Sequence, residues 1–395
     1  MNEDSRLFFS RFPDARGAIY HAFTPYRFCP LGAHVDHQYG FVTGFAIDRG
    51  VKLLYQRTDD ASVRLFSEDF PTEVAFSLHD DPIKKQGDWG DYLRGAVYAL
   101  GKKHRLLRGI RGVIKGSMPI GGLSSSAAVI LCYLQALMQA NDHILNPRET
   151  IDTAYIAEHN FVGVSVGLLD QSCEMYCRKN HLLYLDTKDR NYELIPANPD
   201  MPDFDIVIFY SGLSRRLGSG FNNRVDELRA ASWYLKSLEN LPLNPFSETR
   251  LRDVPEEVYR KHEHSLPEPF RRRARHFYEE CARVHRGAQA WRKGDLVEFG
   301  KQVFLSGESS INNYETGSPH LIALHEALLE APGVYGGRFC GAGFKGCAGA
   351  IVDPAKTEDC IEFVTKRYLD KYPNLLGAYS AHICRTADGV SALLK

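Results

Sequence analysis

The sequence predicts an α+β protein of two domains. A chain of 395 residues is long for a single hydrophobic core, which favours two domains that share an interface. Residues 15–120 alternate short β-branched and aromatic runs with Gly, Pro and Asp, a pattern typical of strands and turns. The second half carries longer helical periods. We therefore expect an N-terminal domain over residues 1–195 and a C-terminal domain over 196–395, with the boundary near the loop-like segment ANPDMPD.

The N-terminal half is expected to change from strands to helices after residue 120. The predicted strands are Val63–Phe66, Val74–Ser77 and Ile110–Lys115. The loop Gly116–Gly122 follows the last of them, and an apolar face with helical spacing then predicts a helix over Ser124–Ala140. A second helix is predicted over Glu149–Val162.

The C-terminal half is expected to be richer in helices and to close with strands. It begins with a buried-strand signal at Phe204–Tyr210 (FDIVIFY). The predicted helices are Asn222–Leu238, Phe270–Arg292, Leu296–Leu305, Pro319–Leu329 and Thr357–Tyr368. The predicted closing strands are Arg338–Cys340, Gly349–Val352 and Ala381–Arg385.

Composition excludes several classes of function. A net charge of −1 and a pI near 6.9 give no electrostatic signature for nucleic acid. The N-terminal segment has early acidic residues and no apolar core of a signal peptide, and no run approaches the 18 apolar residues of a membrane span. The nine cysteines are an odd number scattered among apolar segments, which is typical of reduced thiols. We expect a cytoplasmic, monomeric protein without a membrane or nucleic-acid partner.

The segment KGSMPIGGLSSSAAV, residues 115–129, predicts a phosphate site. Gly121 and Gly122 allow a tight turn and close approach of the backbone to a ligand. Ser124, Ser125 and Ser126 then open a helix, whose first-turn N–H groups and positive dipole end attract anions. An ordinary Ser cap is the alternative, and three serines after Gly-Gly disfavour it. The Lys of a Walker-type loop is absent, so that nucleotide-binding family is excluded.

This segment resembles the second motif of the GHMP kinases, such as galactokinase, homoserine kinase and mevalonate kinase. RFCPLGAHVDH, residues 27–37, resembles the galactokinase signature R-x-N-L-I-G-E-H-T-D-Y, and GAGFKGC, residues 341–347, resembles the third motif G-x-G-F-G-G-C. The resemblance implies the two-domain GHMP-kinase fold, with ATP and sugar in the interdomain cleft. It assigns ATP to Gly121, Gly122, Leu123, Ser124, Ser125, Ser126, Ala127 and Trp89. Trp89 and Tyr92 match a W-x-x-Y segment on the nucleotide side, with core packing as the alternative.

The run AEHNFVGVSVGLLDQ, residues 157–171, resembles A-E-H-S-F-A-G-x-x-C-G-I-M-D-Q of galactokinases and supplies the expected catalytic groups. By resemblance, Glu158 holds Mg²⁺ with Ser126 or Ser125, since Mg²⁺ prefers hard oxygen ligands. Asp170 assists loss of the proton on the sugar C1 hydroxyl, as a base or as a stabilising charge. Arg27 pairs with Asp170 and orients it. A purely structural salt bridge is the alternative for Asp170.

The resemblance also implies the sugar contacts and the kind of sugar. His34, Asp36 and Gly167 match positions that bind the sugar. Ala33 stands where galactokinases have a Glu that contacts the C6 hydroxyl. Lys345 stands in the third motif where they have Gly, and we expect it to bind the substrate as a countercharge, with an outward-pointing surface lysine as the alternative. Loss of a carboxylate at position 33 removes repulsion of an acidic substrate, on the order of several kcal/mol in a partly dry site.

These features are similar to those of plant galacturonokinases, which implies D-galacturonic acid as substrate. Phe221 departs from the pattern, because both groups have a Tyr there near the sugar. Two alternatives stay open: a galactokinase with an altered C6 pocket, and a non-catalytic galactokinase-like sugar sensor. The segment SGLSRRLGSGFNNR, residues 211–224, has the Gly and Ser content of an active-site lid that could close over the substrates.

Overall fold

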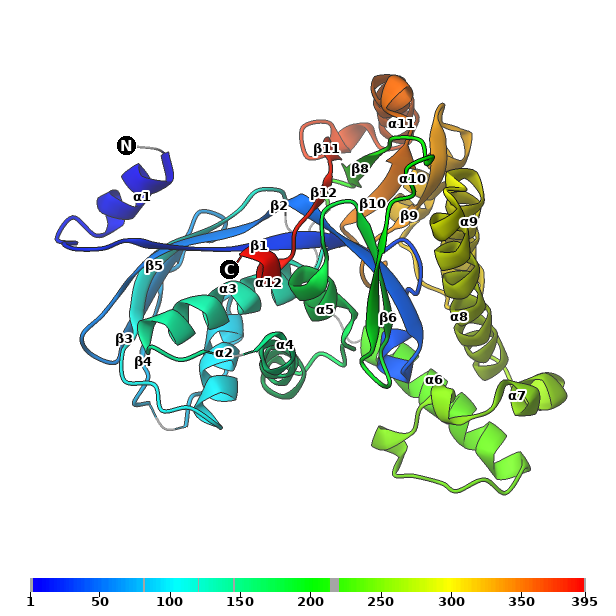
Figure 1. The fold of residues 1–395 in the computed structure, drawn as a ribbon, viewed down its shortest axis with the longest axis horizontal. Helices are drawn as coiled ribbons and strands as arrows, with labels where there is room; N and C mark the ends of the chain where they lie inside the picture. Colours follow the sequence, from blue (N-terminus) through cyan, green and yellow to red (C-terminus); the bar gives the residue numbers. More distant parts are fainter. Residues whose placement is uncertain (1–2, 81, 120, 145, 214–219, 394–395) are drawn as a thin grey trace.

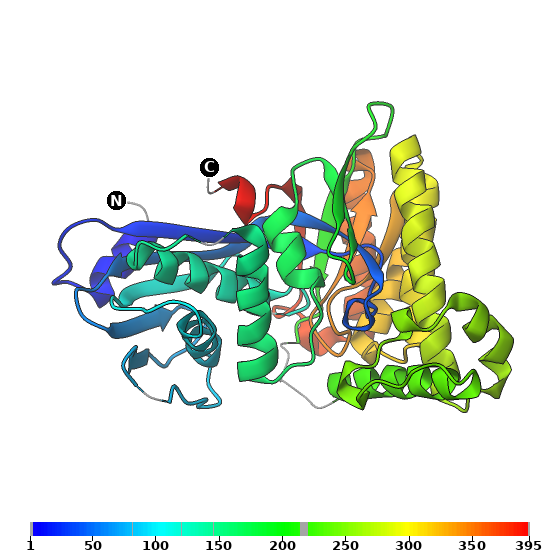
Figure 2. The ribbon, with the colours of Figure 1, turned by 60° about the horizontal axis from the view of Figure 1, so that its bottom comes forward.

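The computed structural model describes residues 3–80, 82–119, 121–144, 146–213 and 220–393, with only the backbone of Glu3, Asp4 and Phe221. Within these ranges the chain forms two β-sheets with helices packed on them, arranged along one long axis (Figure 1). Most strands of the first sheet come from the N-terminal half, and the second sheet lies among the helices of the C-terminal half (Figure 2). The α+β architecture predicted from the sequence is confirmed.

The first sheet has eight strands and is built around β2. Its path runs β4-β3-β5-β2-β6-β7, and β1 and β12 also pair with β2. All pairings are antiparallel except β3 with β5. The strands are β1 (Tyr20–Phe28), β2 (Phe41–Arg57), β3 (Ser62–Ser67), β4 (Val74–Ser77), β5 (Ile110–Gly116), β6 (His181–Asp186), β7 (Tyr192–Pro196) and β12 (Thr386–Ala387).

The second sheet is antiparallel, in the order β11-β8-β10-β9. Its strands are β8 (Asp205–Tyr210), β9 (Val334–Phe339), β10 (Cys347–Val352) and β11 (Ser380–Cys384). Side chains on β9 alternate between two helical layers. A Cβ at Gly336 would meet the backbone of Gly300 on α9 (Leu296–Asn312), whereas a Cβ at Gly337 would meet Leu328 on α10 (Pro319–Glu330).

The remaining helices pack around these sheets. They are α1 (Glu3–Arg11), α2 (Asp91–Gly101), α3 (Ser125–Ala140), α4 (Pro147–Tyr155), α5 (Leu169–Tyr176), α6 (Gly220–Leu238), α7 (Glu256–His262), α8 (Phe270–Lys293), α11 (Thr357–Lys371) and α12 (Val390–Leu393). Short 3₁₀ turns lie at Asp36–Gln38 (η1), Phe246–Glu248, Leu251–Asp253, Glu263–Ser265, Pro354–Lys356 and Pro373–Leu375.

The sequence interpretation of residues 15–120 as strands and turns is wrong at α2. Gly95 weakens the helical signal there, yet the helix needs it, because a Cβ at Gly95 would lie 2.9 Å from the Ala157 carbonyl oxygen. The helix predicted over Glu149–Val162 is also not uniform. It continues beyond α4 as a π-helical turn, η2 (Ile156–Val162), a form that is frequent at functional sites.

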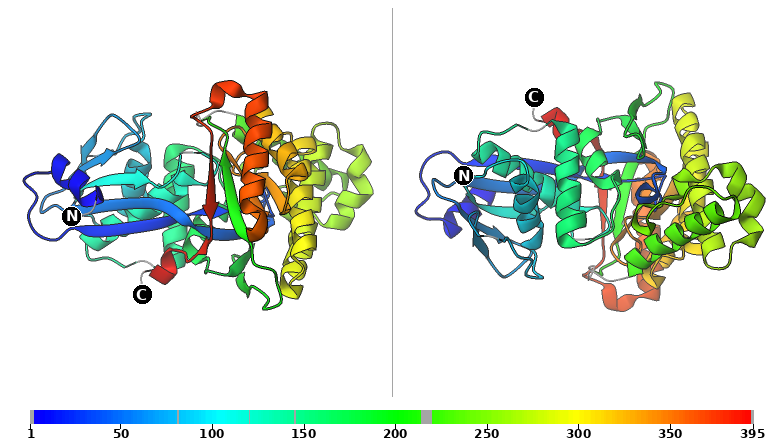
Figure 3. Two further views of the ribbon diagram at one scale, coloured as in Figure 1. Left: turned by 90° about the horizontal axis from the view of Figure 1, so that it is seen from above. Right: turned by 90° about the horizontal axis from the view of Figure 1, so that it is seen from below.

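The end of the chain returns from the second sheet to the first. Residues after β11 form β12, which pairs Thr386 and Ala387 with β2, and α12 follows beside the N-terminal half (Figure 3). One hydrophobic core also crosses between the sheets: Phe28 and Leu31 belong to the same cluster as Ile208 and Ile351. The division at residue 195 stays a prediction, and the last strand of the chain does not follow it.

Among the described residues, none of the helices is both long enough and apolar enough to cross a lipid bilayer. All nine cysteines are free thiols.

Candidate active site

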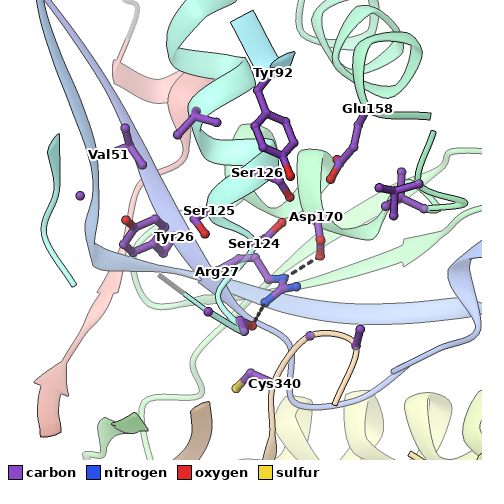
Figure 4. Close-up of a pocket in the computed structure, with 18 of the residues that line it drawn as sticks. Tyr26, Arg27, Val51, Tyr92, Ser124, Ser125, Ser126, Glu158, Asp170 and Cys340 are labelled. Atoms are coloured by element: carbon purple, nitrogen blue, oxygen red, sulfur yellow. Dashed lines mark hydrogen bonds and ion pairs between the residues drawn. The ribbon is translucent and has the colours of Figure 1, made fainter. Parts of the chain in front are cut away.

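A cavity of about 580 Å³ opens between the two halves of the molecule. Its walls come from β1, β5, the N-terminus of α3, η2, the start of α5 and the segment after β9. Figure 4 shows its centre, where Arg27, Asp170, Ser124, Ser126 and Glu158 converge from separate elements. The volume fits one or two small substrates.

The predicted phosphate loop lies on one wall of this cavity and packs against the third motif. Gly121 and Gly122 have φ angles of 151° and 81°. A Cβ at Gly121 would lie 2.9 Å from Gly346 Cα, and one at Gly122 would lie 2.8 Å from Cys347 Sγ. Glycine is therefore required at both positions for conformation and for space. The contact joins a loop of the first half to a loop of the second.

The N-terminus of α3 has the features of an anion site. Ser124 adopts a left-handed conformation (φ 61°) directly before the helix, and its side chain makes no cap hydrogen bond. Its Oγ is buried and has no hydrogen-bond partner. A buried hydroxyl without a partner is costly, so a ligand oxygen is its natural complement. The unpaired first-turn N–H groups of the 16-residue helix α3 point to the same requirement.

Arg27 and Asp170 form a half-buried ion pair at the cavity floor. Arg27 Nε donates to Asp170 Oδ1 at 2.7 Å, and Arg27 Nη1 donates to the Gly122 carbonyl oxygen at 2.8 Å (Figure 4). Burial opposes the charge on Arg27, but the Asp170 carboxylate outweighs it and raises the pKa of Arg27. The arginine thus connects the phosphate loop to the carboxylate, and Asp170 lines the cavity.

The Asp36 side chain, on the turn η1, lies beside Asp170 and the first turn of α5. Its Oδ2 accepts from the Leu169 N–H at 3.2 Å, so this carboxylate interacts with the first turn of α5 from a distant part of the chain. Burial, followed by the charge of Asp170, raises the pKa of Asp36 to about 6. A Cβ at Gly167 would lie 2.2 Å from Asp36 Oδ2, so Gly167 makes room for the carboxylate.

His34 forms an aromatic stack at the same end of the cavity. Its ring lies 4.3 Å from that of Tyr314, with an angle of 9° between the planes. Its Nε2 atom is buried and has no hydrogen-bond partner. Burial, followed by the charge of Arg338, lowers the pKa of His34 well below its usual value, so the ring is neutral. A neutral ring with an unpaired nitrogen can donate or accept one hydrogen bond from a ligand.

Ala33 lines the cavity, and α8 fixes its backbone. Glu280 Oε1 accepts from the N–H groups of Gly32 (2.8 Å) and Ala33 (3.3 Å). His276 Nε2 donates to the Ala33 carbonyl oxygen at 2.9 Å. Residues 276 and 280 are one helical turn apart and face the same way. The direction of the side chain at position 33 is therefore set by a rigid helix.

Glu158 and Ser126 provide oxygen ligands suitable for Mg²⁺. Figure 4 shows both side chains pointing into the same space, together with the Tyr92 hydroxyl. Gln171 Nε2 donates to Glu158 Oε2 at 3.1 Å and orients the carboxylate. The described residues contain no cluster of three or more His, Cys, Asp or Glu with metal-binding geometry. Two protein oxygens beside a phosphate site fit Mg²⁺, which usually completes its octahedron with water and substrate phosphates.

An aromatic pair forms the far end of the cavity. Trp89 stacks on Phe70 with ring centroids 5.7 Å apart and planes at 8°. The indole N–H donates to the Thr72 carbonyl oxygen at 2.9 Å, which fixes the ring. Both rings line the cavity, so the predicted nucleotide-side position of Trp89 lies next to a flat surface on which a purine base can stack.

The structure brings most predicted site residues to one cavity, with some exceptions. The residues that line it are Arg27, Ala33, His34, Asp36, Trp89, Gly121, Gly122, Ser124, Ser125, Ser126, Glu158, Gly167, Asp170 and Lys345. Leu123 and Ala127 are buried beneath the loop and do not line it. Lys345 is exposed at the rim, on the loop that packs on Gly121. The Phe221 side chain and residues 214–219 of the expected lid lie outside the described part of the chain.

Sequence reasoning missed the groups behind position 33. Arg338 lines the cavity, and Glu280, His276 and Tyr314 support the loop that carries Ala33 and His34. His276 lies 243 residues from Ala33 along the chain, so no local motif connects them. The one available signal was the run of polar residues at a repeated three- and four-residue spacing on α8, at 273, 276, 280 and 283.

Two family models match the chain. The model of the GHMP kinases N terminal domain matches residues 91–178, and that of the GHMP kinases C terminal matches residues 288–370. These ranges include the phosphate loop and the third motif.

Individual proteins are similar over nearly the whole chain. A galacturonokinase of Arabidopsis thaliana is 39% identical over 96% of this chain and 95% of its own length. A galactokinase of Roseiflexus sp. is 32% identical over 92% and 90%. The crystal structure of Lactococcus lactis galactokinase complexed with galactose superimposes with a TM-score of 0.86 at 27% identity, covering 96% of this chain and 97% of that one. The mevalonate kinase of Methanococcus jannaschii shares the fold, with a TM-score of 0.65 at 16% identity over 95% and 100%.

Proposed function

Because this chain belongs to the GHMP kinase family and is an ATP-dependent sugar 1-kinase of the galactokinase and galacturonokinase type, we propose that its sugar is D-galacturonic acid. The product is then the sugar 1-phosphate. The observation that carries this proposal is the small, uncharged side chain of Ala33 on the cavity wall, only 8% exposed and held in place through its backbone.

The electrostatics of the pocket support an acidic sugar. Galactokinases have a Glu at the position that matches Ala33, and a carboxylate there would repel the C6 carboxylate of a uronic acid. In a partly dry site that repulsion costs on the order of several kcal/mol. Ala33 removes the repulsion and leaves space for the second carboxylate oxygen of the substrate.

We assign the chemical step to Asp170 and Arg27. The carboxylate of Asp170, in the first turn of α5, faces the cavity where the C1 hydroxyl would lie, and it attracts the hydroxyl proton as the oxygen attacks phosphorus. Arg27 holds Asp170 at 2.7 Å and connects it to the Gly122 carbonyl oxygen, so the attacking group keeps a fixed position relative to the phosphate loop. The N–H groups of α3 and the Ser124 hydroxyl hold the phosphate oxygens of ATP.

We assign Mg²⁺ to Glu158 and Ser126, whose oxygens fit it. The ion would neutralise charge on the ATP phosphates during transfer. The work of the protein here is to keep the Glu158 carboxylate oriented, which the hydrogen bond from Gln171 supports.

We also propose that the chain acts as a monomer in the cytoplasm. Nine free thiols, seven of them buried and two partly buried, suit a reducing compartment. Sedimentation velocity of the purified protein measures the oligomeric state directly.

The decisive experiment compares kcat/KM for galacturonate, glucuronate and galactose with Mg-ATP. We expect galacturonate to be preferred over galactose by at least about 100-fold, since a mismatched charge in a dry pocket costs several kcal/mol. A preference for galactose would identify a galactokinase with an altered C6 pocket. Sugar binding without ADP release for all three sugars would identify a sensor. Asp170→Asn should retain sugar binding while kcat falls by about 100-fold or more.

A further inference from the structure

Arg338 is a buried cation on the wall of the cavity. It lies on β9 two residues after Gly336, so strand alternation directs its side chain to the α9 side of the sheet. Its guanidinium donates to Ser306 Oγ, to Ser310 Oγ at 3.1 Å and to the Phe339 carbonyl oxygen at 3.1 Å. The side chain is 1% exposed and still lines the cavity. All three of these acceptors are uncharged.

No carboxylate among the described residues accepts a hydrogen bond directly from Arg338, and the Ser306 hydroxyl connects the guanidinium to Glu280. Within the described part of the chain the one carboxylate partner of Arg338 is Glu280, with Arg338 Nη1 and Glu280 Oε1 3.9 Å apart, beyond hydrogen-bond distance. Glu280 is engaged more closely by Arg283, whose Nε donates to Oε2 at 2.7 Å. Burial opposes ionisation of Glu280, yet the charges of Arg283, His276 and Arg338 hold the pKa of Glu280 at about 2. Arg338 therefore shares Glu280 with a second arginine that lies closer to this carboxylate.

Glu280 also ties this cluster to position 33. The same Oε1 atom that faces Arg338 accepts from the backbone N–H of Ala33 at 3.3 Å. Glu280 Oε1 thus lies between the Arg338 guanidinium and the Ala33 backbone N–H, and both Arg338 and Ala33 line the cavity. Galactokinases have a carboxylate at position 33, and in this pocket a substrate carboxylate could take its place. That place lies close enough to the Arg338 guanidinium for the two charges to attract.

His34 adds a hydrogen-bonding ring nitrogen at the same place. Its Nε2 is buried without a partner, while its ring is held by stacking on Tyr314. Arg338 is close enough to His34 to disfavour a second positive charge on the ring. A carboxylate arriving here would find a cation and a ring nitrogen that can donate to it in the Nε2–H tautomer, a combination that suits an anion better than a hydroxymethyl group.

We propose that Arg338 and His34 form a subsite for the C6 carboxylate of the sugar, in which Arg338 supplies the countercharge. This inference rests on the proposed function and goes beyond it, because it assigns recognition of the acid to two buried groups instead of the exposed Lys345. The side chain of Ala33 supplies the space, and the α8 residues His276 and Glu280 keep that space rigid.

If Arg338 binds the C6 carboxylate, acidic sugars should depend on it and neutral sugars should not. A uronic acid would bring its own carboxylate to Arg338, whose nearest protein carboxylate lies 3.9 Å away and is shared with Arg283, whereas a neutral hexose leaves the guanidinium as it is in the free protein. Loss of the guanidinium should therefore weaken binding of acidic sugars selectively. Hydrogen bonds to charged groups correspond to roughly 10- to 100-fold in affinity.

The test measures KM and kcat for galacturonate, galactose and ATP in Arg338→Met and Arg338→Lys. We expect Arg338→Met to lose 10- to 100-fold in kcat/KM for galacturonate, mainly through KM, while values for galactose and ATP stay within about three-fold. Arg338→Lys, which retains the charge, should recover most of the activity on galacturonate. If Arg338→Met does not fold, as shown by thermal unfolding, the Lys variant and Arg338→Gln provide the same comparison.

Arg283→Met is the matched control. Arg283 is equally part of the Glu280 cluster but does not line the cavity, so its loss should affect both sugars alike. Equal losses on both sugars in Arg338→Met, or a selective loss in Arg283→Met, would overturn the subsite. If the wild-type protein does not phosphorylate galacturonate, the proposed function is overturned. Kinetics of the wild-type protein therefore distinguish failure of the proposed function from failure of the subsite.

Discussion

At the scale of single residues, the site depends on what stands at position 33. Ala33 is surrounded by groups that fix its backbone and by a cation that has no close carboxylate. The side chain itself contributes little binding energy. Its effect is to leave a volume in which a negative charge is favoured.

Ala33→Glu should therefore reverse the choice of sugar. The introduced carboxylate would lie near Arg338 and repel a uronic acid, so we expect kcat/KM for galacturonate to fall by at least about 100-fold while galactose is phosphorylated as well or better. The steric control is Ala33→Gln, which has the same size without the charge. If both variants lose galacturonate equally, crowding and not charge determines the effect.

Asp36 should give the sugar KM a pH dependence. Its pKa is raised to about 6, so the carboxylate that we expect to accept hydrogen bonds from sugar hydroxyls becomes protonated as the pH falls below that value. We expect the KM for the sugar to rise below pH 6 while the KM for ATP changes little. Initial rates between pH 5 and pH 8 measure this, and a sugar KM that stays flat over that range contradicts it.

The same shift has a consequence for stability. Because the folded-state pKa is above the unfolded value of 3.8, Asp36 contributes stability at low pH that is lost as the pH rises through about 6. Asp36→Asn should thus increase the free energy of unfolding at pH 8 by about 1–2 kcal/mol, below the full value of the shift because Asp36 is partly exposed to the cavity. Denaturant unfolding at pH 5 and pH 8 tests this, and a less stable variant at pH 8 would argue against a strained carboxylate.

At the scale of elements, the conformation of the phosphate loop depends on its contact with the third motif. Gly122 combines a φ of 81° with a Cβ position 2.8 Å from Cys347 Sγ, so any side chain there must displace one loop from the other. Gly122→Ala should raise the KM for ATP or lower kcat by about 10-fold or more, because the phosphates and the attacking oxygen lose alignment.

Gly101→Ala is the matched control for that prediction. Gly101 ends α2, has no positive φ, and an added Cβ would find no atom within 4 Å. We expect kinetics like the parent and a stability equal or higher by up to about 1 kcal/mol. Normal kinetics in Gly122→Ala would show that the loop contact is not needed for catalysis.

At the scale of the whole molecule, one core and one returning strand join the two halves. The cluster that contains Phe28 and Leu31 also contains Ile208 and Ile351 of the second sheet, and β12 pairs with β2. We therefore expect a single unfolding transition in calorimetry. Ligands that bind in the cleft should shift that transition upward as a unit, by about 2.7 kcal/mol at a concentration 100 times Kd. Two separate transitions, of which only one responds to ATP and sugar, would contradict this coupling.

The elements most accurately predicted were those with complete local signals. The helix after the Gly-Gly-Leu-Ser-Ser-Ser segment begins one residue later than predicted, and β4 and the start of α8 agree with the pattern. The helix α2 was missed, because Gly95 reads as a helix breaker until its close approach to η2 is seen. The π-helical turn that carries Glu158 has no separate sequence signal either.

The sequence by itself determined the class of chemistry. Phosphate binding depends on consecutive glycines, serines and a helix N-terminus, which are adjacent in the chain and can therefore be read as a motif. The tertiary structure alone decided what surrounds the variable end of the sugar. His276 and Glu280 reach Ala33 from one helix, and Arg338 lies behind Glu280 on a strand, all more than 240 residues away along the chain. Contacts and charges over such a separation are encoded by no local pattern.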